Sequence, residues 1–348
     1  MDLKKALLEL EERFPSHVKI FKLSDDFKEI QINELPETAF FITDDSRNVN
    51  ENAIFFSTYY SNKFLNDAID KKPLGLFISK KEFQNLLHQK YEGYIILGKK
   101  KPDFYLGHLS SIYYGEPSKN MYIVAITGTN GKTTTSFMIY HLWKKKGIPC
   151  AVIGTLGVYY WNGVKEHHLE TGFTTPRAYE LHNFLSILLQ KKIYHIAIEA
   201  SSEALALRRL EGLNIQKAIF TTFGRDHLDF HHTMNAYFFA KLHLFFLTLR
   251  TTEQKIPFIV VYDKNTYYHF HRFIKKTNSN ILFLLSSNLN FSFVKNQPMP
   301  LLFNQFNALC AFYGISENEV PLFDLNETPL EDFKGVPGRV DRIKLNDN

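Results

Sequence analysis

Hydrophobic positions follow two different patterns along the chain, and the first pattern occupies the N-terminal third. There, apolar runs of four residues alternate with polar segments, which predicts short strands separated by short helices. Before these runs, residues 1–14 alternate apolar and charged side chains at helical spacing. The predicted strands are Ala39–Ile42, Ala53–Phe56, Gly75–Ile78 and Tyr94–Leu97.

The second pattern begins at Met121, where apolar strands alternate with longer helical segments. Such alternation predicts a mostly parallel sheet with helices on both faces, and Asn162-Gly163 within residues 159–165 indicates a tight hairpin. The predicted strands are Tyr122–Thr127, Cys150–Gly154, Tyr194–Ala200, Lys217–Thr222 and Pro257–Tyr262. The predicted helices are Thr133–Lys146, Arg177–Lys192, Met234–Arg250 and Asn304–Gly314.

Turn-forming residues divide the chain into regions. Residues 115–120 are typical of a linker, and Val336-Pro337-Gly338-Arg339 is typical of a hinge. The sequence therefore predicts an α/β fold with a small N-terminal α/β domain over residues 1–116 and a central, mostly parallel-sheet domain over residues 117–335. Residues 336–348 are expected to form the hinge and a stub of a further domain.

Composition narrows the class of protein. Among 348 residues, 45% are hydrophobic and 22% charged, as in ordinary globular proteins. The net charge of +5 is spread over short lysine runs, which favours a solvated surface over a nucleic-acid patch. No apolar run reaches the roughly 18 residues of a membrane span, and the two cysteines show neither disulfide nor zinc spacing. We therefore expect a cytoplasmic protein with no nucleic-acid or membrane partner. The protein is also expected to be a monomer.

A glycine-containing loop follows the predicted strand 122–127 and opens the next helix. Its glycines allow backbone N–H groups to face phosphate oxygens, and the helix N-terminus favours negative charge. Lys132 is expected to reach the β- and γ-phosphates, and the Thr133 hydroxyl to bind Mg²⁺. The alternative is a structural turn with a surface lysine. The loop consists of Gly128, Thr129, Asn130, Gly131, Lys132, Thr133 and Thr134.

Two further side chains follow predicted strands. Glu199 ends one buried strand, and His227 lies in Arg225-Asp226-His227-Leu228-Asp229 after another. Open α/β sheets place ligands at such strand ends, and carboxylate and imidazole groups can bind the metal ion that offsets phosphate charge. The alternatives are a buried ion pair or helix cap for Glu199 and a hydrogen-bonded core histidine for His227.

Lys241 is unusual because its predicted helix is apolar nearly all round. Met234, Phe238 and Phe245 fall on its own face by helical spacing. An ammonium group in that position is costly unless it is partnered or chemically altered. The alternative is a lysine whose stem is buried and whose ammonium reaches water.

The loop string GTNGKTT resembles the ATP loop of the Mur ligase family and of its relative folylpolyglutamate synthase. The resemblance spans residues 43–341 and implies that ATP phosphorylates a carboxylate, which an amine then attacks to form an amide. Asp45-Ser46-Arg47 resembles the members that add the third peptide residue, diaminopimelate or lysine, to UDP-N-acetylmuramoyl-L-alanyl-D-glutamate. It implies a UDP-sugar-binding first domain, an ATP-binding central domain and the absence of a C-terminal Rossmann-like domain.

The resemblance also implies roles for single residues. Residues 225–241 resemble a segment of the family in which CO₂ carbamylates a lysine. The resemblance implies that Lys241 is carbamylated, which gives it a carboxylate group that helps hold Mg²⁺. Asn304 and Asn307 correspond to adenine contacts and Arg339 to a phosphate contact. The implied metal-binding residues are Thr133, Glu199, His227 and Lys241. The implied catalytic residues are Lys132, Glu199, His227 and Lys241. The implied substrate-binding residues are Ser46, Arg47, Thr174, Thr175, Ser201 and Arg209.

Several positions depart from the family's pattern. Phe173 replaces an asparagine, Glu203 a histidine, Tyr262 an asparagine and Leu301 a glycine. Because the amino-acid site is expected in the absent domain, we expect this chain to bind ATP and the UDP-sugar but to ligate little by itself. The alternatives are another Mur or folylpolyglutamate-type ligase and a non-catalytic nucleotide-binding remnant.

Overall fold

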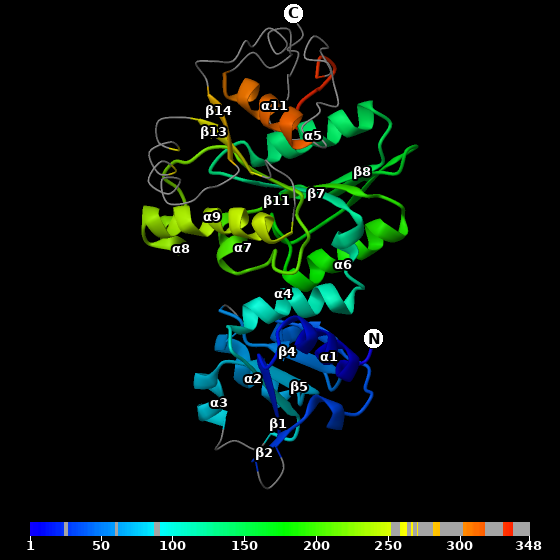
Figure 1. Ribbon diagram of the computed structural model, residues 1–348, viewed down its shortest axis with the longest axis vertical. Helices are drawn as coiled ribbons and strands as arrows, with labels where there is room; N and C mark the ends of the chain where they lie inside the picture. Colours follow the sequence, from blue (N-terminus) through cyan, green and yellow to red (C-terminus); the bar gives the residue numbers. More distant parts are fainter. Residues whose placement is uncertain are drawn as a thin grey trace, which may run out of the picture. The chain divides into compact units, whose positions relative to one another are not determined.

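The computed structural model describes residues 1–23, 27–59, 62–86, 91–251, 258–262, 266, 270, 281–285, 302–316 and 330–336. The chain forms two compact units, each with its own sheet (Figure 1). Unit 1 comprises Met1–Pro117, Arg177–Ser186 and Leu207–Leu213. Unit 2 comprises Ser118–Pro176, Ile187–Ala206 and Asn214–Asn348.

Unit 1 contains a six-stranded sheet in the order β2-β1-β6-β5-β4-β3. Strands β3 to β6 pair in parallel, whereas β1 pairs antiparallel with β6 and β2. The strands predicted at 53–56 and 75–78 are confirmed, and the strand predicted at 39–42 lies at 41–43. The elements are α1 (Leu3–Arg13), β1 (Val18–Leu23), β2 (Phe27–Ile30), β3 (Phe41–Thr43), β4 (Ala53–Phe56), α2 (Leu65–Asp70), β5 (Gly75–Ile78), α3 (Lys80–Leu86), β6 (Tyr94–Gly98) and α4 (Pro102–Tyr113).

Helices cover both faces of this sheet because its strands are apolar on both sides. Phe56 packs into a core with Leu7 of α1 and Leu109 of α4. The preceding residue Phe55 points to the opposite face and packs with Ala68 of α2. This alternation follows from the two-residue side-chain repeat of a strand.

Unit 2 contains an eight-stranded sheet in the order β10-β9-β8-β11-β7-β12-β13-β14. The six neighbouring strands β8, β11, β7, β12, β13 and β14 pair in parallel, and β9 and β10 form the antiparallel edge. The predicted mostly parallel sheet is therefore confirmed. The strands are β7 (Tyr122–Thr127), β8 (Cys150–Gly154), β9 (Gly157–Trp161), β10 (Glu166–Leu169), β11 (His195–Glu199), β12 (Lys217–Phe220), β13 (Phe258–Tyr262) and β14 (Ile281–Leu285).

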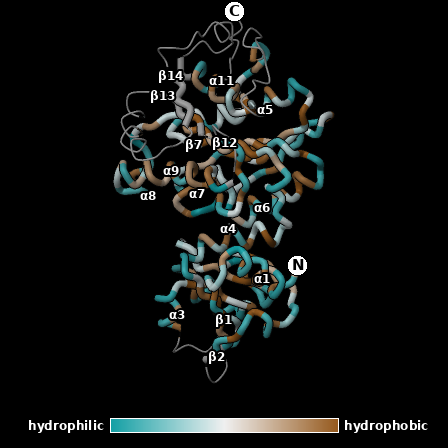
Figure 2. The backbone as a smooth tube through the Cα atoms, viewed as in Figure 1, coloured by the Kyte–Doolittle hydropathy of each residue, from teal (hydrophilic) through white to brown (hydrophobic). Residues whose placement is uncertain are grey.

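Helices lie on both faces of the unit 2 sheet, with α5 and α11 on one face and α7 and α9 on the other (Figure 1). Ile139 of α5 and Phe312 of α11 share one core with Val124 of β7. Figure 2 shows that β7 and β12, in the middle of this sheet, are hydrophobic. The helices of unit 2 are α5 (Lys132–Lys145), α7 (Ser202–Ala206), α8 (Leu228–His231), α9 (Met234–Thr251) and α11 (Leu302–Gly314), while α6 (Ala178–Gln190) begins in unit 1 and ends in unit 2.

The compact units differ from the predicted division at 116/117, because two later segments belong to unit 1. Ala178, at the start of α6, is buried in the unit 1 core. His182 shares a hydrogen bond of 3.2 Å with the carbonyl oxygen of Glu211, which ties the two segments to each other. Among the described residues, no helix combines the length and hydropathy that crossing a bilayer requires.

Candidate active site

The predicted phosphate loop connects β7 to α5, and its glycines are required by its shape. Gly128 and Gly131 have φ angles of +146° and +87°, which disfavour other residues. A Cβ atom on Gly128 would lie 2.0 Å from Thr221 Oγ1. The loop is anchored to the segment that follows β12, since Thr129 N donates to the Thr222 carbonyl at 2.8 Å. Strand, loop and helix therefore have the order that the sequence predicted.

Lys132 and Thr133 begin helix α5 directly after the loop. The Lys132 ammonium donates to the carbonyl oxygens of Gly128 and Thr129 at 2.9 and 3.1 Å. The Thr133 side chain is buried and donates to Glu199. Thr134 follows in the first helical turn and is half-buried. The predicted loop residues thus form one continuous structure.

Glu199 lies at the end of β11, fully buried beside the loop. Its Oε2 accepts from Thr133 Oγ1 at 2.8 Å and from Thr155 Oγ1 at 3.1 Å, and its Oε1 accepts from Thr155 N at 3.0 Å. Burial raises the pKa of Glu199, while these hydrogen bonds and the charge of Lys132 oppose that rise. The structure thus brings together Lys132, Thr133 and Glu199.

The Thr133–Glu199 pair offers two neighbouring oxygen atoms, the ligand type that Mg²⁺ prefers. These atoms are joined by a hydrogen bond of 2.8 Å between Thr133 Oγ1 and Glu199 Oε2. Within the described ranges, no group of three or more His, Cys, Asp or Glu side chains could hold a metal ion. Phosphate oxygens, water and the predicted ligands His227 and Lys241 would have to supply the further ligands.

Lys241 lies within α9 and is 1% exposed, as its apolar surroundings predicted. Its Nζ donates to the Gly128 carbonyl oxygen at 2.9 Å and lies 4.5 Å from the ring centre of Tyr237. Burial lowers the pKa of Lys241 well below its usual value, and the charge of Lys132 lowers it further. The side chain therefore points to the phosphate loop rather than to water, unlike the alternative considered from the sequence.

His227 lies before α8 in a left-handed backbone conformation, with φ of 48°. Its Nδ1 is 3.6 Å from Glu203 Oε1 and its Nε2 is 3.3 Å from Asp226 Oδ2. The ring is half-exposed, so the alternative of a buried core histidine does not apply. Glu203, one of the departures from the family's pattern, thus neighbours a predicted metal ligand.

The predicted substrate residues of unit 2 gather near the end of β11. The Thr175 hydroxyl is buried, donates to the Glu199 carbonyl at 2.7 Å and accepts from Ser201 N at 3.1 Å. Ser201 Oγ accepts from Ala204 N at 3.1 Å and caps α7. Thr174 Oγ1 lies 3.3 Å from Thr155 Oγ1. Because the Thr175 and Ser201 hydroxyls have these structural contacts, their predicted contacts with substrate stay predictions.

The predicted substrate residues of unit 1 are Ser46, Arg47 and Arg209. Ser46 is buried, and Lys71 Nζ donates to its carbonyl oxygen at 2.7 Å. Arg47 is largely exposed and pairs with Asp45 at 2.6 Å. The hydrogen bond from the Arg47 side chain lowers the pKa of Asp45 to about 2. Ser46 and Arg47 thus occupy a loop whose backbone a lysine stabilises.

The predicted adenine-contacting residues lie in α11. Asn304 and Asn307 are buried, and Thr135 Oγ1 donates to Asn307 Oδ1 at 3.4 Å. A Cβ atom on Gly131 would lie 2.5 Å from Asn307 Oδ1. Asn307 therefore packs closely against Gly131 of the phosphate loop, and its contact with adenine stays a prediction. Arg339 and Leu301 lie outside the described residues.

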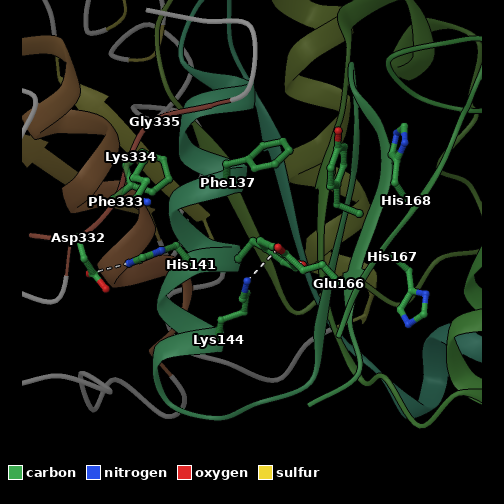
Figure 3. Close-up of a pocket in the computed structure, with 12 residues that line it drawn as sticks. Phe137, His141, Lys144, Glu166, His167, His168, Asp332, Phe333, Lys334 and Gly335 are labelled. Carbon is green, nitrogen blue, oxygen red and sulfur yellow. Dashed lines mark hydrogen bonds and ion pairs between the residues drawn. The ribbon is translucent and has the colours of Figure 1, made fainter. Parts of the chain in front are cut away.

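A separate pocket of about 540 Å³ lies beside α5, the β9–β10 hairpin and residues 332–335 (Figure 3). Two pairs of its side chains contact each other: Lys144 with Glu166 at 2.8 Å and His141 with Asp332 at 3.1 Å. None of its lining residues is a predicted site residue. We assign the pocket no ligand.

Comparisons with known proteins show which family the chain is similar to. Residues 126–299 match the Mur ligase middle domain. UDP-N-acetylmuramoyl-L-alanyl-D-glutamate–2,6-diaminopimelate ligase of Leptospira interrogans is 32% identical over 66% of this chain and 46% of its own length. The same ligase of Prochlorococcus marinus is 34% identical over 80% of this chain and 58% of its own length.

A solved structure of a ligase with that name is 25% identical and superposes with a TM-score of 0.63, covering 90% of this chain and 65% of the other. The chain spans about half the length of the curated relatives it matches. The family match covers half of the chain and includes the phosphate loop, Glu199, His227 and Lys241. The chain belongs to the Mur ligase family.

Proposed function

We propose that this chain is part of an ADP-forming ligase that adds the third amino acid to UDP-N-acetylmuramoyl-L-alanyl-D-glutamate during peptidoglycan synthesis. The observation that carries the proposal is the contact between Thr133, in the phosphate-loop helix, and Glu199, buried at the end of β11. The similar ligases from Leptospira and Prochlorococcus, whose names specify 2,6-diaminopimelate, support this amino acid over lysine.

The reaction requires that the substrate carboxylate attack the γ-phosphate of ATP, which releases ADP and leaves an acyl phosphate. The amine of the incoming amino acid then displaces phosphate and forms the amide. Mg²⁺, when bound by Thr133 and Glu199, would offset the negative charge that gathers between the phosphates and the carboxylate. Lys132 would turn from the loop carbonyls, which it contacts at 2.9 and 3.1 Å, towards the phosphates.

His227 and Lys241 would complete the metal-binding side. The buried Lys241 amine, with its lowered pKa, is suited to form a carbamate and thereby replace a cation with an anion. Thr174, Thr175, Ser201, Ser46, Arg47 and Arg209 are proposed to bind the UDP-sugar and its dipeptide. A monomeric state and a cytoplasmic location stay predictions from the sequence.

Ligand binding and a partial reaction test this function. In calorimetric titrations, UDP-N-acetylmuramoyl-L-alanyl-D-glutamate should bind more tightly than UDP-N-acetylmuramoyl-L-alanine, and a folate should not bind. With ATP, Mg²⁺ and the UDP-dipeptide, oxygen-18 in the β,γ-bridge of ATP should exchange into non-bridging positions, which reports acyl-phosphate formation without the amino acid. Preference for a folate would favour the folylpolyglutamate alternative, and binding without exchange would favour a non-catalytic remnant.

A further inference from the structure

Thr155, which the sequence did not single out, lies where two strands of the site end together. Strands β8 and β11 are parallel neighbours with Ile153 opposite Ile198. Gly154 pairs with Gly157 across the β8–β9 hairpin, so the turn consists of Thr155 and Leu156. This register places the turn beside Glu199, at the edge of the sheet where open α/β folds bind ligands.

Thr155 contacts both carboxylate oxygens of Glu199. Its backbone N–H donates to Oε1 at 3.0 Å and its hydroxyl to Oε2 at 3.1 Å. Oε2 also accepts from Thr133 Oγ1 at 2.8 Å. The carboxylate is thus held from two directions, with the hairpin turn on one side and the phosphate-loop helix on the other.

The Thr155 hydroxyl also reaches Thr174, with an Oγ1–Oγ1 distance of 3.3 Å. An ionised Glu199 only accepts hydrogen bonds, so Thr155 donates its proton to Glu199 and accepts the proton of Thr174. Thr174 is a proposed substrate residue, whereas Thr133 is a proposed metal ligand. The hydroxyl of Thr155 therefore joins the substrate side of the site to the nucleotide side.

The turn that presents Thr155 is itself fixed. His168 of β10 shares a hydrogen bond of 2.8 Å with the Leu156 carbonyl. Gly157 has a φ of +96°, and a Cβ atom there would lie 2.4 Å from the Leu169 carbonyl oxygen. Because the neighbouring strand leaves the turn little freedom, Thr155 is held in one orientation before any ligand binds.

We propose that Thr155 is a positioning residue of the ligation reaction. It holds the Glu199 carboxylate turned towards Thr133, and through Thr174 it aligns the substrate acid with the metal-bound phosphates. This inference rests on the proposed function, because it gives Thr155 a role only if Glu199 contributes to Mg²⁺–nucleotide binding.

Two substitutions separate the hydroxyl from the rest of the side chain. Thr155→Val keeps the branched shape but removes the hydroxyl, and Thr155→Ser keeps the hydroxyl. With a fluorescent ATP analogue and the full 348-residue chain, the Mg²⁺ concentration for half-maximal binding should rise about tenfold in Thr155→Val, as for other residues that orient a metal ligand. Thr155→Ser should stay close to wild type, and circular dichroism should show both variants folded.

A double-mutant cycle with Glu199→Gln shows whether Thr155 acts through Glu199. In the Glu199→Gln background, Thr155→Val should add almost nothing to the Mg²⁺ requirement. A folded Thr155→Val protein with the wild-type requirement would overturn the positioning role, as would equal, additive losses in both backgrounds. By contrast, a wild-type chain without Mg²⁺-dependent nucleotide binding, or one indifferent to Glu199→Gln, would contradict the proposed function itself.

Discussion

Lys132 and Lys241 direct their Nζ atoms to the same acceptor, the carbonyl oxygen of Gly128, each at 2.9 Å. Two ammonium groups that share one carbonyl repel each other, and Lys241 is also buried. Both effects lower the pKa of Lys241, with burial the larger. A lower pKa increases the fraction of neutral amine, which is the form that reacts with CO₂.

We expect Lys241 to carry a carbamate at neutral to slightly alkaline pH. Incubation with ¹³C-bicarbonate should give a carbamate resonance in the ¹³C NMR spectrum that disappears upon acidification. Lys241→Met, which suits the apolar surroundings, should remove that resonance, while Lys145→Met should keep it because Lys145 lies at the surface and pairs with Asp332. A resonance that persists in Lys241→Met would assign the carbamate to another amine.

Lys132→Ala should weaken binding of Mg²⁺–ATP by roughly tenfold to a hundredfold, since hydrogen bonds to charged groups contribute about 1.5–3 kcal/mol. Lys145→Ala is the matched control, because Lys145 lies in the same helix α5 and is bound to Asp332 at 2.7 Å. Calorimetric titration of both variants measures the difference. Equal affinities for the two variants would contradict the assignment of Lys132 to the phosphates.

Gly154→Ala should damage the site more than the fold. A Cβ atom at this position would lie 2.0 Å from Glu199 Oε1 and 2.8 Å from its Cγ, so the Glu199 side chain has to turn away from Thr133. We expect the Mg²⁺ requirement for nucleotide binding to rise while the thermal midpoint changes little. Gly172→Ala is the control, since a Cβ atom there meets no atom within 4 Å. A large fall in the thermal midpoint of Gly154→Ala would show that the strand, and not the carboxylate, absorbs the clash.

We expect the free energy of unfolding of unit 1 to fall as the pH is lowered, because His182 is buried as a neutral ring. Burial lowers the pKa of this histidine from 6.5 to about 4, so the folded state favours the neutral ring. The unfolded state therefore binds more protons between these values, and the stabilisation, complete above pH 6.5, is lost as the pH falls towards 4. The loss amounts to about 3 kcal/mol for one group.

His182→Gln tests this prediction because its amide keeps a donor for the Glu211 carbonyl, which the histidine contacts at 3.2 Å. Urea unfolding at pH 7.5 and pH 5 should show a smaller drop in the free energy of unfolding for the variant than for the wild type. Parallel pH curves for the two proteins would mean that another group causes the acid sensitivity.

The sequence predicted the elements of unit 2 well because their hydrophobic patterns are strong. Strands Tyr122–Thr127 and Cys150–Gly154 have the predicted bounds, and the burial of Lys241 followed from helical spacing. Hairpin β1–β2 was missed because lysines interrupt its apolar positions, and β10 is mostly exposed. These strands depend on their pairing partners more than on their own hydrophobicity.

The contacts of Thr155 and Glu203 could not be predicted, because each depends on which strand ends are neighbours in space. Thr155 meets Glu199 only because β8 pairs with β11 in one register. Glu203 lies 3.6 Å from His227 although 23 positions separate them in the chain, which a single sequence does not reveal. The glycine pair at 154 and 157 was the available signal for the turn.

Strand β7 lies between β11 and β12 in the sheet. The phosphate loop, Glu199 and the segment before His227 therefore lie at the ends of three adjacent strands. Their spacing is consequently set by backbone pairing at the centre of the sheet. Insertions or substitutions at the edge strand β14 can therefore accumulate with little effect on the chemistry, whereas β10 also holds the turn that presents Thr155. A change in the middle three strands, in contrast, perturbs folding and catalysis together.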